Sequence, residues 1–105
     1  MTPISKKQLN NRNRLARQFL LSELRLYRQY LDRPDEYRKR VIESVLQLKE
    51  YAANCSPSHA LFLQLLIDGK SQDAICKTVA IQPSTYYSWR NKMIDVFAQH
   101  MDILI

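Results

Sequence analysis

Hydroxyl, amide and basic side chains gather between residues 72 and 92, in a pattern suited to hydrogen bonding with base edges. The candidates are Gln72, Gln82, Ser84, Thr85, Tyr87, Ser88, Asn91 and Lys92. Small hydroxyls and amides with neighbouring cations near the start of a helix fit the major groove of DNA. Helix N-termini also favour phosphate, and Gln72 stands at such a start. The chemistry indicated is recognition of a nucleic acid, and the simpler alternative is a polar face that only contacts water.

These residues fall on two helices that the sequence delimits sharply. Ser71 is a good N-cap for a short helix ending near Val79, and Pro83 suits the first turn of a last helix reaching about His100. Two helices joined by so short a turn predict a helix-turn-helix. The expected inward side chains are Ala74, Ile75 and Val79 from the first helix, Ile81 from the turn, and Tyr86, Trp89 or Arg90, Met93 and Phe97 from the second. Ala80 stands where such turns often carry glycine.

Residues 61–103 resemble a known family, most specifically in Ser-Thr-Tyr-Tyr-Ser-Trp-Arg-Asn-Lys-Met-Ile-Asp-Val-Phe-Ala at 84–98. They look like the ArpU/RinA-type regulators of phage and prophage late genes in Gram-positive bacteria, whose C-terminal half is similar to the region-4 helix-turn-helix of sigma factors. Residues 1–55 match only in being helical, basic and rich in Tyr and Leu. The resemblance implies a sequence-specific transcription regulator in which Ser84, Thr85, Tyr87, Ser88 and Asn91 recognise DNA.

The positive charge lies away from this motif. The chain has a net charge of +6, but residues 1–40 carry eleven basic and four acidic side chains, whereas residues 71–105 carry three of each. Neutralising phosphates supplies much of the affinity of DNA-binding proteins. A helix-turn-helix without net charge therefore requires positive charge from another part of the protein. We therefore expect phosphate contacts from some of Lys6, Lys7, Arg12, Arg14 and Arg17. The alternatives are a solvated helix face or a protein partner such as RNA polymerase.

Two longer helices are expected before the motif. After a polar arm from Thr2 to Asn11, residues 12–31 carry an apolar stripe of Leu20, Leu24, Tyr27 and Leu31, extended by Leu15 and Phe19. This stripe either closes the core or forms the seam of a homodimer. Asp32-Arg33-Pro34 ends the helix. A second helix over residues 35–53 presents Val41, Val45, Leu48 and Ala52, widened by Ile42 and Leu46.

The third helix should be the buried centre of the fold. Residues 60–67 are almost wholly apolar, Ser56 and Pro57 suit the helix start, and Gly69 suits its left-handed end. Five helices in 105 residues predict an all-α class, with a basic region over 1–55 and a helix-turn-helix region over 56–105 in one compact domain. The single glycine disfavours phosphate-binding loops, dinucleotide fingerprints and hairpin-rich β folds.

Other functions receive less support from the sequence. Cys55 and His59 could share a helix face, but two ligands do not make a tetrahedral zinc site. No nucleophile–base pair or carboxylate dyad is evident, so we expect no enzyme, metal or cofactor. Two cysteines without a CxxC pair, no apolar signal segment and no long apolar run predict a cytoplasmic chain that does not enter a membrane. A helical protein–protein adaptor, such as a phage packaging or assembly subunit, remains the alternative function.

Overall fold

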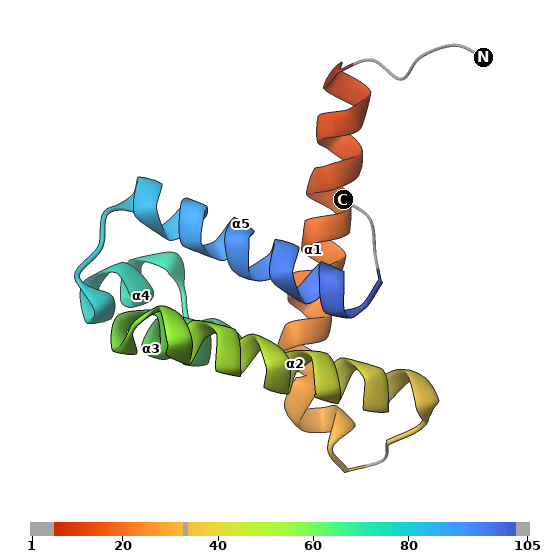
Figure 1. The fold of residues 1–105 in the computed structure, drawn as a ribbon. Coiled ribbons are helices and arrows are strands. Elements are labelled where there is room, and N and C mark those ends of the chain that lie inside the picture. The colour runs from red at the N-terminus through yellow and green to blue at the C-terminus, as the bar shows by residue number, and fades with distance from the viewer. Residues whose placement is uncertain (1–5, 33, 103–105) are drawn as a thin grey trace.

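A computed structural model describes the backbone of residues 6–32 and 34–102, and the side chains from residue 14 onward within those ranges. The described chain forms five α-helices and no strand: α1 Lys6–Tyr30, α2 Glu36–Cys55, α3 Pro57–Ile67, α4 Gln72–Val79 and α5 Pro83–His100 (Figure 1). The predicted all-α class with about five helices is confirmed.

Short polar side chains begin three of the helices. Asp35, Ser56 and Ser71 each accept a hydrogen bond from a backbone N–H three residues later, at 2.8, 3.1 and 3.2 Å. Pro57 lies in the first turn of α3, where its missing N–H costs nothing. Gly69 follows α3 with φ +76°, the left-handed conformation expected there. The predicted starts of α3 and α4 are therefore correct.

The core lies where α1, α2, α3 and α5 meet. Helix α3 contributes Phe62, Leu63, Leu66 and Ile67, all at most 3% exposed, as its apolar run predicts. Helix α2 contributes the four expected side chains, Val41, Val45, Leu48 and Ala52, and α5 contributes Met93, Ile94 and Phe97. Leu20, Leu24 and Tyr27 of α1 pack into the same cluster. This part of the α1 stripe therefore closes the core of its own chain.

Several apolar residues expected to be inward are exposed instead. Leu15 is 61% and Phe19 50% exposed, because the inward face of α1 continues from Leu20 through Arg17, which pairs with Asp95 of α5. Leu31 lies beyond the end of α1 and is 49% exposed. Leu46 of α2 and Leu61 of α3 are 52% and 43% exposed, since no described helix covers those flanks.

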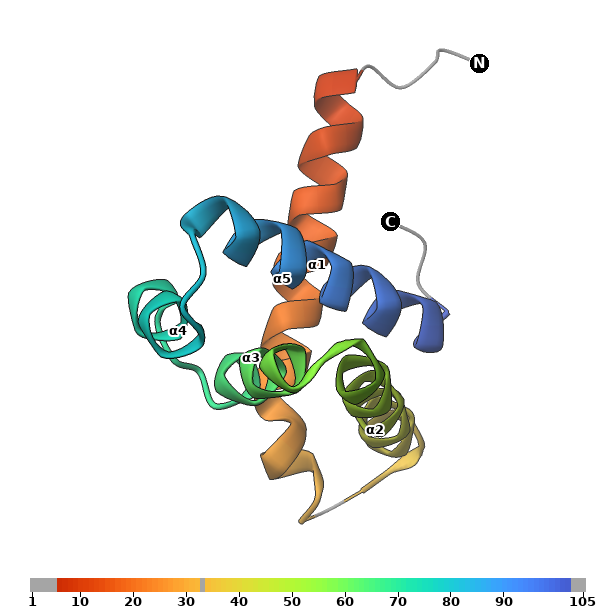
Figure 2. The same cartoon turned by 60° about the vertical axis from the view of Figure 1, so that its left-hand side comes forward.

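The first helix is longer than predicted. It begins at Lys6, within the stretch that we expected to be an arm. Once a helix is nucleated, each further residue adds one hydrogen bond, so a helix can extend beyond the part that carries its apolar stripe. At about 1.5 Å per residue, α1 is roughly 37 Å long. Its N-terminal turns project beyond α5 in both views (Figures 1 and 2).

Candidate nucleic-acid interface

The predicted helix-turn-helix is formed by α4, the turn over residues 80–82, and α5. Ile75 of α4 is fully buried and Tyr86 of α5 is 5% exposed, so each helix has an inward anchor as expected. Ile81 in the turn packs partly buried against the same core. Ala80 adopts φ 60° and ψ 53°, the left-handed conformation that glycine takes most easily. Alanine therefore makes this turn in spite of its Cβ atom.

The outer face of α5 carries most of the candidate recognition residues. Ser84, Ser88 and Lys92 are exposed, and Tyr87 is 44% exposed. Thr85 and Asn91 are only partly exposed and flank that row. Gln82 is exposed at the N-cap position, where its side chain makes no capping hydrogen bond. The N-terminal half of the outer face of α5 thus presents hydroxyl groups toward solvent, and one ammonium group follows at the middle of the helix.

Two candidates from different helices contact each other. The hydroxyl of Tyr87 donates a hydrogen bond of 2.8 Å to Oε1 of Gln72, at the start of α4. The ring of Tyr87 also packs edge-on against the ring of Tyr86, with 5.3 Å between centroids. Tyr87 is therefore fixed at both its ring and its hydroxyl, and the contact ties the first turn of α4 to α5.

The choice between Trp89 and Arg90 as the inward residue is settled by their neighbours. The ring of Trp89 stacks on His59 of α3 at 3.7 Å and meets Phe62 edge-on at 5.5 Å. His59 also lies 2.6 Å from the hydroxyl of Ser56, through its Nδ1 atom. Trp89 thus packs α5 on α3, and Arg90 is turned toward α1.

Arg90 lines the candidate interface, although the sequence analysis considered it only as an inward residue and not for DNA contact. Its guanidinium lies over the ring of Tyr87, 5.1 Å from the centroid, and its Nη2 donates to Oδ1 of Asn91 at 3.3 Å. Its Nε is buried and makes no hydrogen bond to any described residue. The spacing of three residues from Tyr87 offered a signal, because such residues are neighbours on a helix surface.

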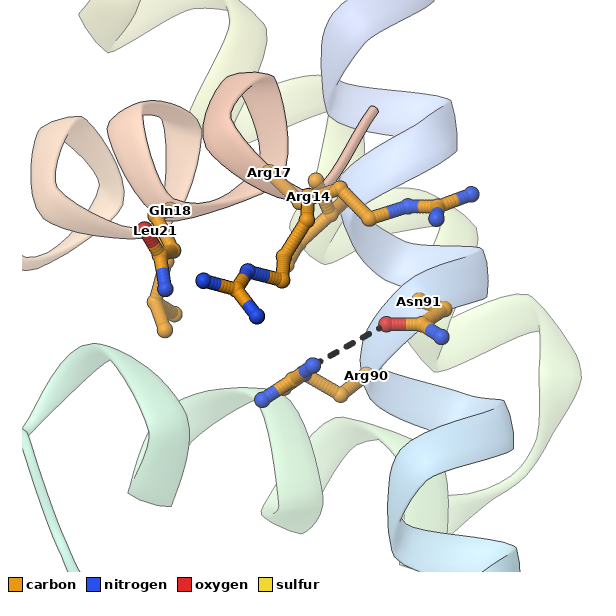
Figure 3. A pocket seen from close by; sticks show the side chains of 7 residues that line it. Arg14, Arg17, Gln18, Leu21, Arg90 and Asn91 are labelled. Carbon is orange, nitrogen blue, oxygen red and sulfur yellow. Dashed lines mark hydrogen bonds between the residues drawn. The ribbon is translucent and has the colours of Figure 1, made fainter. Parts of the chain in front are cut away.

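A pocket of about 350 Å³ lies between α1 and α5. Arginines from both helices line it: Arg14 and Arg17 from α1, and Arg90 from α5, next to Asn91 (Figure 3). Arg17 donates to Oδ1 of Asp95 from Nε and Nη2, at 3.3 and 3.2 Å. Arg17, predicted as a phosphate contact, therefore already holds α1 against α5 through a carboxylate.

The remaining basic candidates lie toward the start of α1. Arg14 is exposed, and no carboxylate among the described side chains pairs with it. Lys6, Lys7 and Arg12 belong to α1, but their side chains lie outside the described residues. The structure thus brings two predicted phosphate contacts, Arg14 and Arg17, to the same pocket as Asn91, and only Arg17 is paired with a described carboxylate.

Tyrosines with raised pKa values lie elsewhere, between α1 and α2. Burial raises the pKa of Tyr30, and a hydrogen bond of 2.8 Å from its hydroxyl to Oε2 of Glu23 adds to this. Burial, followed by hydrogen bonding to the same Glu23, raises the pKa of Tyr37 to about 12. Glu23 is itself only 8% exposed. This cluster joins the two helices and contacts no candidate recognition residue.

Comparison with known protein families, curated proteins and solved structures finds no match for this chain. None of the helices in the described ranges is both long and apolar enough to cross a membrane. The chemistry of the interface must therefore be read from its own residues.

Proposed function

We propose that this protein is a sequence-specific DNA-binding transcription regulator whose helix α5 enters the major groove. The observation that carries the proposal is the division of α5 into two faces. Tyr86, Met93 and Phe97 are buried, whereas Ser84 and Ser88 in the first turns and Lys92 at the middle of the helix are exposed. Short hydroxyls at the N-terminal part of a recognition helix can reach base edges, while a neighbouring lysine approaches phosphate.

The arrangement of α1 supports a role for the basic N-terminal region. Residues 71–105 have no net charge, whereas residues 1–40 carry a net charge of +7. The positive charge that neutralises phosphates would therefore come from the N-terminal region. Helix α1 lies beside α5 and projects beyond it, on the side away from α2 and α3 (Figures 1 and 2). A duplex seated on the outer face of α5 would then run past α1, so its phosphates would meet positive charge there.

The sequence resemblance extends this proposal to a biological setting. Residues 84–98 resemble ArpU/RinA-type regulators, which favours control of phage or prophage late genes in the bacterial cytoplasm. RNA polymerase is the protein partner that such a role implies. A homodimer would bind two half-sites separated by about one turn of the duplex, roughly 34–36 Å between centres.

Selection from random duplex DNA tests the proposal. The protein should enrich a defined site, and its affinity for that site should exceed its affinity for a scrambled duplex by about 10³-fold or more at physiological salt. Binding to both duplexes should weaken as salt rises. Recovery of unenriched sequence, with equal affinity for every duplex, would overturn the assignment.

A helical protein–protein adaptor is the second candidate, and the exposure of Leu15 and Phe19 on α1 favours it. Neighbouring exposed apolar side chains are typical of surfaces that bind another protein. An adaptor should pass through a heparin or duplex-DNA column without salt-dependent retention. A DNA-binding regulator should be retained and elute as the salt concentration rises.

A further inference from the structure

We propose that the pocket between α1 and α5 binds a phosphate group through the guanidinium groups of Arg14 and Arg90 and the side-chain amide of Asn91. This inference deepens the proposed function and rests on it in one respect: the phosphate would belong to the backbone of the bound duplex. The same chemistry would also accept free inorganic phosphate. The experiment below separates the two sources.

The charge of the pocket favours an anion. Three guanidinium groups line it, and the described acidic side chains supply one contact among them, from Asp95 to Arg17. Two positive charges, on Arg14 and Arg90, thus share this pocket without a carboxylate partner in the described chain. Like charges held close together repel, and a phosphate placed between them would replace that repulsion with attraction.

Arg90 is held in place before any ligand binds. Its stacking over Tyr87 and its hydrogen bond to Asn91 fix the plane of the guanidinium group. Figure 3 shows Arg90 and Asn91 on the α5 side of the pocket and the arginines of α1 on the other. Because a fixed guanidinium loses little conformational entropy on binding, it is well suited to the paired oxygens of a phosphate.

The pocket has room for a phosphate group beside the guanidinium groups that line it. The Nε of Arg90 is covered by protein atoms, so a ligand in the pocket would bind other nitrogens of this group. The pocket, at about 350 Å³, far exceeds the roughly 10–15 Å³ needed for one water molecule. It therefore has room for a phosphate group with attached water.

The position of the pocket matches the geometry of a recognition helix. Asn91 lies one turn after Tyr87 on α5 and is partly exposed, and Arg14 lines the same pocket from α1, the helix that projects beyond α5. A strand bordering the major groove would pass this corner while the first turns of α5 contact bases. A phosphate fixed here would set the depth and register of α5 without reading sequence.

Two variants of α1 with the same loss of charge test the site. Arg14→Gln removes a pocket arginine, and Arg25→Gln removes an exposed arginine of the same helix outside the pocket. Neither side chain is buried, so both variants should fold, as circular dichroism can verify. In a third variant, Arg90→Lys, the positive charge is retained but the planar guanidinium group is lost.

Duplex binding is measured against salt concentration for each protein. Arg14→Gln should reduce the slope of log K against log[salt] by about 0.9, the value for one phosphate contact. It should also lower the affinity for the selected and the scrambled duplex equally, by about tenfold or more. Arg25→Gln should change the slope and both affinities less. Equal effects of the two variants would overturn the proposed site while leaving DNA binding intact.

Free inorganic phosphate is titrated in parallel, with the side-chain amide resonances of Asn91, which lines the pocket in every variant, as the readout. A saturable shift at constant ionic strength, lost in Arg14→Gln and Arg90→Lys but kept in Arg25→Gln, supports the site. If phosphate saturates it in a protein that binds no duplex, the proposed function fails and the site stands with free phosphate as its ligand. A duplex effect specific to Arg14 without free-phosphate binding assigns the site to the DNA backbone. Absence of both effects overturns the inference.

Discussion

The hydroxyl of Tyr87 donates a hydrogen bond to Gln72 across the helix-turn-helix, at 2.8 Å. Among the described residues, this is the side-chain hydrogen bond that joins α4 to α5. It links two residues that the sequence had nominated separately for DNA contact. It restrains the angle between the two helices at their exposed ends. Neither side chain is buried, so each can be replaced without disturbing the core. The contribution of the hydrogen bond to stability can therefore be measured.

We expect Tyr87→Phe and Gln72→Ala each to lower the free energy of unfolding by about 0.5–1.5 kcal/mol. Since both changes break the same bond, the double variant should lose little more than either single variant, a coupling that a double-mutant cycle in urea measures. Strictly additive losses would show that the two side chains act independently.

The helix boundaries of the C-terminal half could be predicted because local chemistry sets them. Ser56, Ser71 and Gly69 act within one turn of their own position, and the structure places them as expected. The start of α1 could not be predicted in the same way. Its first turns have no apolar stripe, and the helix is extended from a packed portion that begins further along the chain.

The pocket could not be predicted because it depends on a crossing between helices far apart in sequence. Arg17 and Asp95 are 78 residues apart, and nothing local to either indicates their ion pair. The same crossing decides that Phe19 is exposed while Leu20 is buried. Helical periodicity predicted which side of α1 is apolar. Which residues of that side are buried and which are exposed depends on where α5 crosses α1.

Removing the carboxylate that engages Arg17 should strengthen DNA binding. Asp95→Asn deletes a negative charge near the proposed phosphate site and frees Arg17, so affinity for any duplex should rise and depend more steeply on salt. The cost in stability should be at most about 1 kcal/mol, since both side chains are partly exposed. Glu43→Gln removes an exposed carboxylate from α2 and serves as the control. The expectation fails if the two variants bind duplex DNA equally well.

The turn of the helix-turn-helix should tolerate glycine better than alanine. Ala80 holds a left-handed conformation that costs an ordinary L-residue about 1–2 kcal/mol. Ala80→Gly should therefore raise the free energy of unfolding by about 1 kcal/mol, after allowing for the greater entropy of unfolded glycine. In the exposed last turn of α2, Ala53→Gly should lower it, by at most about 1 kcal/mol. Denaturant unfolding of both variants is the measurement, and a loss of stability for both would contradict the stated strain.

The contact between Tyr37 and Glu23 should make stability fall in alkali. The pKa of Tyr37 is raised from 10.0 to about 12 in the folded protein, so folding favours its protonated form. That contribution is fully present below about pH 10 and is lost as the pH rises through about 12. Wild-type protein and Tyr37→Phe are to be unfolded in urea between pH 8 and pH 12. The stability advantage of the wild type should shrink over the upper two pH units, and a constant difference would argue against the raised pKa.

The most direct test of the central claim is the preference for a selected duplex over a scrambled one, measured before and after the outer face of α5 is altered. The test variant replaces Ser84, Thr85 and Ser88 by alanine and leaves Asn91 in place, because Asn91 also lines the proposed phosphate pocket. Each lost base contact should remove about 1–3 kcal/mol of discrimination. We predict that the preference falls by at least about tenfold while affinity for the scrambled duplex is retained. A folded triple variant that keeps the full wild-type preference would contradict the assignment of α5 as the recognition helix.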